Sequence, residues 1–245
     1  MIETFQAWVV DWLTGWLGPN EWQAVALSLR VAFVATLASL PLGVLVAYAL
    51  ARWRFFGHGL LNALVHLPLV LPPVVTGYLL LIGFGRQGPI GGFLDETFGI
   101  RFAFEWTGAA LASAVMGFPL MVRAIRLAFE AIDPKLEDAA STLGASRFMV
   151  LFTVTLPLAL PGIIAGVVLA FAKAMGEFGA TITFVSNIPG RTQTIPSAIY
   201  AFLQVPGGEE SAFRLILVSI AVSIGAVLIA ELLARRASSA RRGDR

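Results

Sequence analysis

The sequence predicts an all-α integral membrane protein, a bundle of about five transmembrane helices. Two observations carry this prediction: the composition of the chain and the length of its uncharged runs. Of the 245 residues, 58% are hydrophobic and 13% are charged, and the mean hydropathy is +0.82. Soluble domains carry roughly one-quarter charged residues, so most of this surface cannot face water.

Five apolar runs have the length, or nearly the length, needed to cross a bilayer. Residues 31–51, 59–85 and 148–172 contain no Asp, Glu, Lys or Arg, and shorter runs of this kind cover 106–122 and 215–230. A span needs roughly 20 apolar residues, which the shorter runs reach with their flanks. Because the runs do not alternate as the strands of a membrane barrel do, we expect helices. Burial of such helices inside a soluble core would need charged outer elements, which this chain lacks.

The predicted spans divide the chain without a separable second domain. Residues 1–245 form one domain, with a possible interfacial helix at 1–20, a transmembrane core at 22–234, an inner loop at 130–157 and a basic tail at 235–245. The spans are predicted at residues 22–51, 59–85, 106–127, about 148–182 and 212–233. Pro68, Pro72 and Pro73 must kink or break the second span. The stretches 86–105 and 186–211 are expected to be outer loops.

The placement of basic residues orients the bundle, because positively charged loops stay on the cytoplasmic side. With the N-terminus outside, the inner segments carry eleven Lys and Arg residues and the outer segments carry four, namely Arg86, Arg101, Arg191 and Arg214. The reverse orientation would invert this ratio. We therefore expect an N-terminus outside, a C-terminus in the cytoplasm, and location in the cytoplasmic membrane.

The two ends of the chain have separate explanations. Trp8, Trp12 and Trp16 recur every four residues in a segment too short to span, which suits either a helix in the outer interface or one packed against the bundle. The arginine-rich tail after Ala234 is interpreted as an anchor beside anionic lipid rather than a nucleic-acid arm.

Several kinds of chemistry are excluded by residue type. There is no cysteine, so thiolate metal sites and cysteine nucleophiles are absent. Lys135 and Lys173 are the only lysines and neither follows a phosphate-binding glycine motif, while His58 and His66 are the only histidines and do not form a zinc motif. We therefore expect no cofactor, no metal site and no ATP hydrolysis by this chain itself.

The inner loop contains a predicted short helix. Asp133 can cap a helix whose first residue is Pro134, and Gly144 stands where a helix end favours a left-handed residue. Between them, the spacing i, i+3, i+4, i+7 places four small or apolar side chains on one face: Leu136, Ala139, Ala140 and Leu143.

This loop resembles that of the permeases of binding-protein-dependent ABC importers. Their pattern is Glu-Ala-Ala, three residues, Gly, nine residues, then Ile-x-Leu-Pro. Here Asp138, Ala139 and Ala140 are followed at the same spacings by Gly144 and by Val154-Thr155-Leu156-Pro157. Asp replaces Glu and Val replaces Ile; anchoring on Glu137 instead would break the register. Residues 66–75, 118–126 and 176–184 are similar to molybdate permeases in particular, with sulfate and tungstate permeases as relatives.

The resemblance implies a type I ABC importer permease fold with a cytoplasmic coupling helix that docks on a separate ATPase subunit. The implied docking residues are Leu136, Asp138, Ala139, Ala140, Leu143 and Gly144, with Leu156 and Pro157 at the entry to the next span. It further implies a second permease copy, two ATP-binding subunits and an outer oxyanion-binding protein. The implied substrate is molybdate, with tungstate or sulfate and thiosulfate as alternatives.

Polar residues in the fourth predicted span are the other candidates. Lys173 and Glu177 lie four residues apart and can form an ion pair, which either lines the pathway or fixes helix packing. Four neutral polar residues follow, and these suit transient contact with an anion but also bridge helices: Thr181, Thr183, Ser186 and Asn187.

Two other functions fit the sequence less well. An ion-coupled secondary transporter would show internal repeats with paired broken helices, and no repeat is evident. A membrane enzyme would need clustered His, Cys or carboxylate residues, which this chain does not provide.

Overall fold

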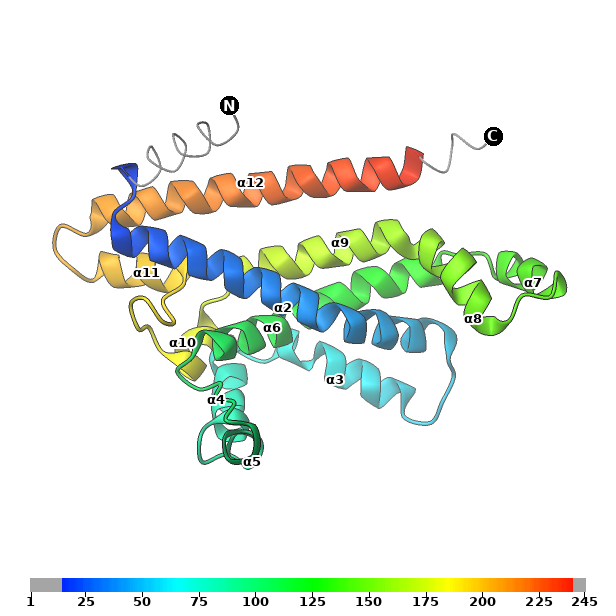
Figure 1. The fold of residues 1–245 in the computed structure, drawn as a ribbon, viewed down its shortest axis with the longest axis horizontal. Helices are drawn as coiled ribbons and strands as arrows, with labels where there is room; N and C mark the ends of the chain where they lie inside the picture. Colours follow the sequence, from blue (N-terminus) through cyan, green and yellow to red (C-terminus); the bar gives the residue numbers. More distant parts are fainter. Residues whose placement is uncertain (1–14, 240–245) are drawn as a thin grey trace.

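The computed structural model describes residues 15–239, and these form helices and loops only. Three long helices, α2 (Pro19–Arg52), α6 (Trp106–Glu130) and α9 (Leu156–Met175), run side by side along the molecule (Figure 1). The fourth long helix, α12 (Glu209–Ser239), lies along one side of them, and α3 (His58–Val70) lies along another. The expected first, third and fifth spans are confirmed as α2, α6 and α12.

The second predicted span is broken, as its prolines require. Helix α3 ends at Val70, and α4 (Pro73–Phe84) begins after two residues, with an angle of 114° between the two axes. Pro72 ends the first hydrogen-bonded ladder and Pro73 starts the second at its first position, where a missing N–H costs nothing. Pro68 lies inside α3 and does not end it. Counting the bent pair as one span, the described residues contain up to five spans.

The fourth predicted span ends earlier than expected. Its helix starts with α8 (Arg147–Val150), passes through a five-residue π-helix (Leu151–Thr155) and continues as α9 to Met175. Gly176 then stops α9, and α10 (Gly179–Val185) is a separate short helix. The predicted boundary near Ile182 was wrong because the apolar residues after Gly176 were counted with the span, although Lys173 and Glu177 flank the break.

Both expected outer loops contain a helix. The stretch 86–105 holds α5 (Pro89–Phe98), and the stretch 186–211 holds α11 (Ile195–Leu203). Each begins with proline among its first two residues, which is a start signal, and α5 is followed by a left-handed Gly99, which is a stop signal. The glycine-rich composition hid these signals. The predicted interfacial helix falls mostly on residues 1–14, which lie outside the described residues.

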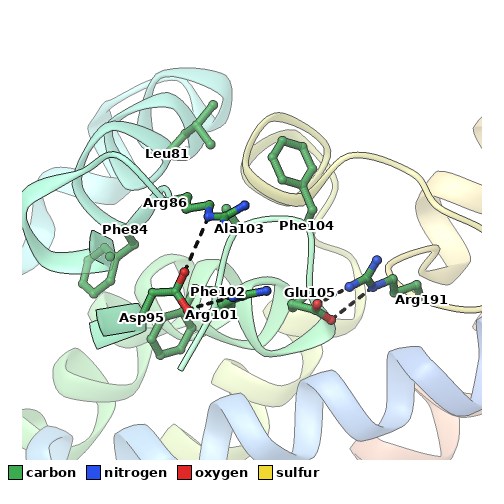
Figure 2. A pocket seen from close by; sticks show the side chains of 11 residues that line it. Leu81, Phe84, Arg86, Asp95, Arg101, Phe102, Ala103, Phe104, Glu105 and Arg191 are labelled. Atoms are coloured by element: carbon green, nitrogen blue, oxygen red, sulfur yellow. Dashed lines mark hydrogen bonds and ion pairs between the residues drawn. The ribbon is translucent and has the colours of Figure 1, made fainter. Parts of the chain in front are cut away.

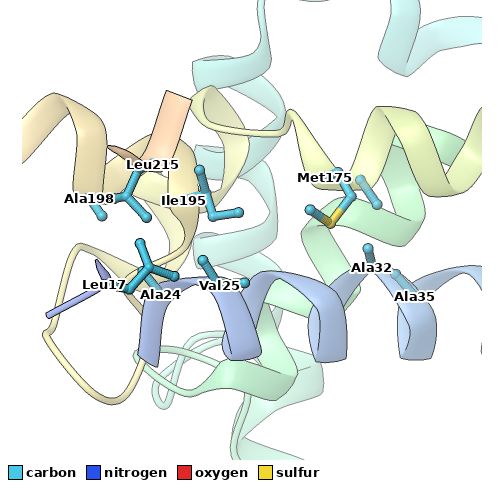
Figure 3. Close-up of a cluster of buried hydrophobic side chains, with 10 residues drawn as sticks. Leu17, Ala24, Val25, Ala32, Ala35, Met175, Ile195, Ala198 and Leu215 are labelled. Carbon is cyan, nitrogen blue, oxygen red and sulfur yellow. The ribbon is translucent and has the colours of Figure 1, made fainter. Parts of the chain in front are cut away.

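Small residues at several points of the core let helices approach closely. Gly162 of α9 faces α6 so tightly that a Cβ at this position would lie 2.1 Å from the Cβ of Ala128. Such packing replaces the hydrophobic driving force that is missing between helices in lipid. A cluster of buried hydrophobic side chains joins α2, α9, α11 and α12 (Figure 3). It includes Leu17, Ala24, Val25, Met175, Ile195 and Leu215.

Two polar contacts fix the same end of the bundle. Arg214 at the start of α12 pairs with the buried Glu21 of α2 at 2.9 Å, and Glu21 also accepts the backbone N–H of Gly18 at 2.7 Å. The Ser28 hydroxyl oxygen accepts the backbone N–H of Ile195 at 2.7 Å.

Large apolar side chains elsewhere are exposed, including Phe33, Leu42 and Leu45 on α2. In a bilayer, lipid covers such surfaces.

Candidate functional site

The predicted inner helix exists with the predicted ends. Helix α7 (Pro134–Thr142) starts at Pro134, and the carboxylate of Asp133 accepts the backbone N–H of Lys135 at 3.0 Å. Leu143 is the C-cap, and Gly144 follows with a φ of +89°, the left-handed conformation that favours glycine. The loop thus turns on the residues that the sequence singled out.

Helix α7 projects from one end of the bundle (Figure 1). None of its nine residues, all of them described, is buried. Leu136 and Leu143 expose 49% and 89% of their surfaces, Ala139 is exposed and Ala140 is half-buried. This face is a small apolar patch with a polar surround. Asp138 is exposed as well.

The segment after α7 re-enters the bundle through an unusual helix. The Ser146 hydroxyl caps α8 by accepting the backbone N–H of Met149 at 3.3 Å. The π-helix then ends at Thr155, and Leu156 and Pro157 open α9. Pro157 lacks an N–H and crowds the carbonyl four residues earlier, and a wider turn before it relieves this crowding.

Glu137, which the sequence motif passed over, connects α7 to two other elements. Its Oε1 accepts a hydrogen bond from Arg52 Nη2 of α2 at 3.2 Å and from the Thr155 hydroxyl at 2.8 Å. Arg52 Nη2 also lies 3.4 Å from the carbonyl oxygen of Ile132, which accepts its hydrogen bond. The sequence offered one indication of this contact: an acidic residue lies on the predicted inner loop, and an arginine lies at the predicted inner end of the first span.

The pair of Lys173 and Glu177 forms, but at a helix break rather than along one helix. Lys173 Nζ lies 2.5 Å from Glu177 Oε2, and the Glu177 side chain is 1% exposed. The other carboxylate oxygen accepts the backbone N–H of Ala180 at 3.0 Å, in the first turn of α10. Glu177 therefore joins α9 to α10 by one ion pair and one hydrogen bond.

The four neutral polar residues are mostly engaged with the backbone. The hydroxyls of Thr181 and Thr183 donate to the carbonyl oxygens of Phe178 and Gly179, both at 2.9 Å. Asn187 Nδ2 lies 3.3 Å from the carbonyl oxygen of Ser197, whereas its buried Oδ1 has no hydrogen-bond partner among the described residues. Ser186 is exposed and has a φ of +64°.

The two broken spans meet at their breaks. Helices α4 and α10 pack closely, and a Cβ at Gly77 would lie 2.5 Å from the carbonyl oxygen of Ala180. A Cβ at Gly179 would lie 2.7 Å from the Cβ of Pro73, which is the first residue of α4. The predicted pathway residues thus lie beside a contact of two short helices, far along the bundle from α7 (Figure 1).

A charged pocket of about 390 Å³ lies beside α4 and α5 (Figure 2). These two helices lie away from α7 (Figure 1). Asp95 contacts Arg101 at 2.7 Å and Arg86 at 3.6 Å, and Glu105 pairs with Arg191. The hydrogen bond from Arg191 to Glu105 raises the pKa of the guanidinium above its ordinary value. Three of the four arginines predicted for the outer segments therefore line one pocket with two carboxylates.

Long apolar helices, two broken spans and a polar helix that projects from one end define the molecule as a multi-pass membrane protein. A family model described as "Binding-protein-dependent transport system inner membrane component" matches residues 39–239. The chain belongs to this family and is a multi-pass inner-membrane protein.

The relatives are similar over almost their whole length. The chain is 64% identical over 215 residues to the molybdenum transport system permease protein ModB of Escherichia coli strain K12, covering 88% of this chain and 94% of the relative. It is 58% identical over 216 residues to the protein of the same name from Haemophilus influenzae, with the same coverage. Among solved structures, a chain of a bacterial ABC transporter that imports alginate has the same fold, with a TM-score of 0.72 at 20% identity, covering 92% of this chain and 82% of that chain.

Proposed function

We propose that the chain is the membrane-spanning permease subunit of an ATP-driven importer for an oxyanion, and that the anion is molybdate. The observation that carries the proposal is the 64% and 58% identity to two molybdenum transport permeases across nearly their full lengths. In this proposal the chain works as one of two permease copies, two cytoplasmic ATP-binding subunits supply the energy, and an outer binding protein delivers the anion.

Helix α7 is the proposed contact with the ATP-binding subunit. Its exposed apolar face, formed by Leu136, Ala139 and Leu143 with the half-buried Ala140, would enter a cleft of that subunit, and Gly144 would turn the chain back toward the membrane. The support is the exposure of the patch together with its position at one end of the bundle.

A bulky residue on the α7 face tests this contact. In Ala139→Phe the new ring meets no internal neighbour, because Ala139 is exposed, so we expect folding to persist and binding of the ATPase subunit to fall. Ser141→Phe, on the opposite side of the same helix, is the matched control. Equal ATPase association in both variants and the parent would contradict the assignment of this face.

The orientation of the chain in the membrane is proposed from the distribution of Lys and Arg residues. In this orientation α7 lies in the cytoplasm and the pocket of Figure 2 lies outside. Because the chain has no cysteine, one introduced cysteine reports its own side of the membrane. We expect Ser141→Cys in α7 to be labelled by an impermeant maleimide only in inverted vesicles. Gln204→Cys, exposed after α11, should be labelled in right-side-out cells. The opposite pattern would overturn the topology.

The substrate is tested by reconstitution. The complex in liposomes is supplied with ATP and with binding protein loaded with molybdate, tungstate or sulfate, and both hydrolysis and uptake are measured. We expect the greatest stimulation with molybdate. Greater stimulation with tungstate or sulfate would reassign the anion within the same class, and uptake that needs an ion gradient but no ATP would favour a secondary transporter.

A further inference from the structure

Few side-chain contacts attach α7 to the rest of the bundle. The helix buries none of its own nine residues, all of which are described, so side-chain packing contributes little to its position. Its N-terminal cap, from Asp133 to Lys135, is local to the loop. The hydroxyls of Ser141 and Thr142 bond to carbonyl oxygens within α7 itself.

The carboxylate of Glu137 supplies contacts that leave the helix. One oxygen, Oε1, receives two donors from two different places: the guanidinium of Arg52 at the last residue of α2, and the hydroxyl of Thr155 at the last residue of the π-helix. Thr155 is 1% exposed, and the side chains of Arg52 and Glu137 are 17% and 23% exposed. A charge-assisted contact with this degree of shielding is stronger than a surface ion pair.

Both partners depend on this carboxylate. Arg52 Nε is buried without a hydrogen-bond partner among the described residues, and Nη2 has the Ile132 carbonyl as its second acceptor. Without Glu137, the Arg52 guanidinium would keep only the neutral carbonyl oxygen of Ile132 as an acceptor. The Thr155 hydroxyl would keep a weaker contact, 3.4 Å from the Val150 carbonyl oxygen inside the π-helix.

We propose that Glu137 is a positioning residue that holds the coupling helix α7 to the ends of two spans, α2 and the α8–α9 span, so that a movement of α7 reaches both spans together. The proposal rests on the proposed docking of α7 on an ATPase subunit. It assigns a role to the residue next to the motif rather than to the motif acid Asp138, which is exposed.

The physical reason lies in the geometry of the shared oxygen. A displacement of α7 cannot lengthen one of the two contacts without moving the oxygen that makes the other, so the two spans respond as a unit. The π-helix of Leu151–Thr155 interrupts the α8–α9 span at this point, and single-turn π-helices inside α-helices are frequent at functional sites. The Thr155 contact connects Glu137 to the last residue of this π-helix, so a movement of α7 acts on that residue.

The first test measures the position of α7 without any partner subunit. A spin label is attached to Ser141→Cys in the full cysteine-free chain, and its mobility is compared in the parent and in Glu137→Ala. We expect a clearly more mobile label in Glu137→Ala and an intermediate mobility in Thr155→Val, which removes the hydroxyl at nearly constant shape. Unchanged mobility in both variants would overturn the proposal, whatever the outcome of the transport assays.

The second test measures coupling in the reconstituted complex. Loss of a charge-assisted hydrogen bond corresponds to about a tenfold effect, so we expect stimulation of ATP hydrolysis by loaded binding protein to fall about tenfold in Glu137→Ala. The exchange Arg52→Glu with Glu137→Arg should recover part of the loss. Glu130→Ala is the matched control, because Glu130 forms a similar pair with Arg126 at 2.7 Å on α6 but has no contact of this kind with α7.

The outcomes separate the two proposals. Normal stimulation in Glu137→Ala, with the parent complex stimulated as expected, overturns the role of Glu137. A loss of the same size in Glu130→Ala also overturns it, since the effect would then not be specific to α7. Absence of ATPase association in the parent complex would instead refute the proposed function, while the spin-label measurement would still decide whether Glu137 positions α7.

Discussion

Replacing Gly77 by alanine tests the contact between the two broken spans. The added Cβ would lie 2.5 Å from the carbonyl oxygen of Ala180, and 2.9 Å from both the Cα of Ala180 and the Cβ of Thr183. Two of these three atoms belong to the backbone of α10, so a side-chain rotation cannot relieve the overlap. Helix α4 would have to move away from α10 by about 0.9 Å, from 2.5 Å to the 3.4 Å of ordinary contact.

The expected change in the free energy of unfolding for Gly77→Ala follows from two opposing effects. Overpacking of a tight contact costs about 1–3 kcal/mol, while alanine in place of glycine inside a helix gains about 0.5–1 kcal/mol. We therefore expect Gly77→Ala to lower the free energy of unfolding by about 1–2 kcal/mol. For a chain of this size that corresponds to a fall in Tm of about 2–8 °C.

Gly83→Ala provides the matched control on the same helix. A Cβ at Gly83 meets nothing within 4 Å, so only the gain in helix propensity applies, and Tm should rise by about 1–4 °C. Both variants are compared by thermal unfolding of the purified chain in detergent. Equal Tm values for Gly77→Ala and Gly83→Ala would refute the close approach of α4 and α10.

Three further predictions concern single polar contacts. Lys173→Met leaves the Glu177 carboxylate buried without its cation, so we expect a loss of about 3 kcal/mol and a clearly lower Tm; adding Glu177→Gln should recover part of it. Ser28→Ala removes the acceptor of the buried Ile195 N–H, which should cost about 1–3 kcal/mol in the same assay. Asp133→Ala removes the N-terminal cap of α7 and should cost about 1 kcal/mol locally, seen as faster hydrogen exchange of the α7 amides at unchanged global Tm.

Each of these predictions has its own contradicting result. An unchanged Tm in Lys173→Met would show that the ion pair with Glu177 does not stabilise the chain. A Tm of Ser28→Ala equal to that of the parent would show that Ile195 finds another acceptor. Equal exchange rates in Asp133→Ala would show that the Asp133 carboxylate does not stabilise the first turn of α7.

The segment at residues 133–144 could be predicted in detail because its signals are local. Capping by Asp133, a first-position proline at Pro134 and a left-handed glycine at Gly144 act within a few residues of one another, and all three are confirmed. The break at Pro72 and Pro73 is of the same kind. The end of α9 at Met175 was not predicted, although Lys173, Gly176 and Glu177 lie around it, because the apolar residues that follow were counted with the same span.

Contacts between distant residues were beyond the reach of the sequence. Arg52 and Thr155 lie 85 and 18 residues from Glu137, and the spacing of a motif says nothing about such partners. The clustering of Arg86, Arg101 and Arg191 around one pocket is similar: their shared side of the membrane could be predicted, but their meeting depends on how α5 folds back.

By itself, the sequence determined that this protein is helical, crosses the membrane about five times, and presents a short capped helix between its third and fourth spans. It could do so because hydropathy, proline and capping are properties of neighbouring residues. Only the tertiary structure decided that α4 and α10 meet at their breaks, that Glu177 joins α9 to α10, and that Glu137 ties α7 to two spans. These depend on the close approach of helix backbones, which is set by packing across the whole bundle.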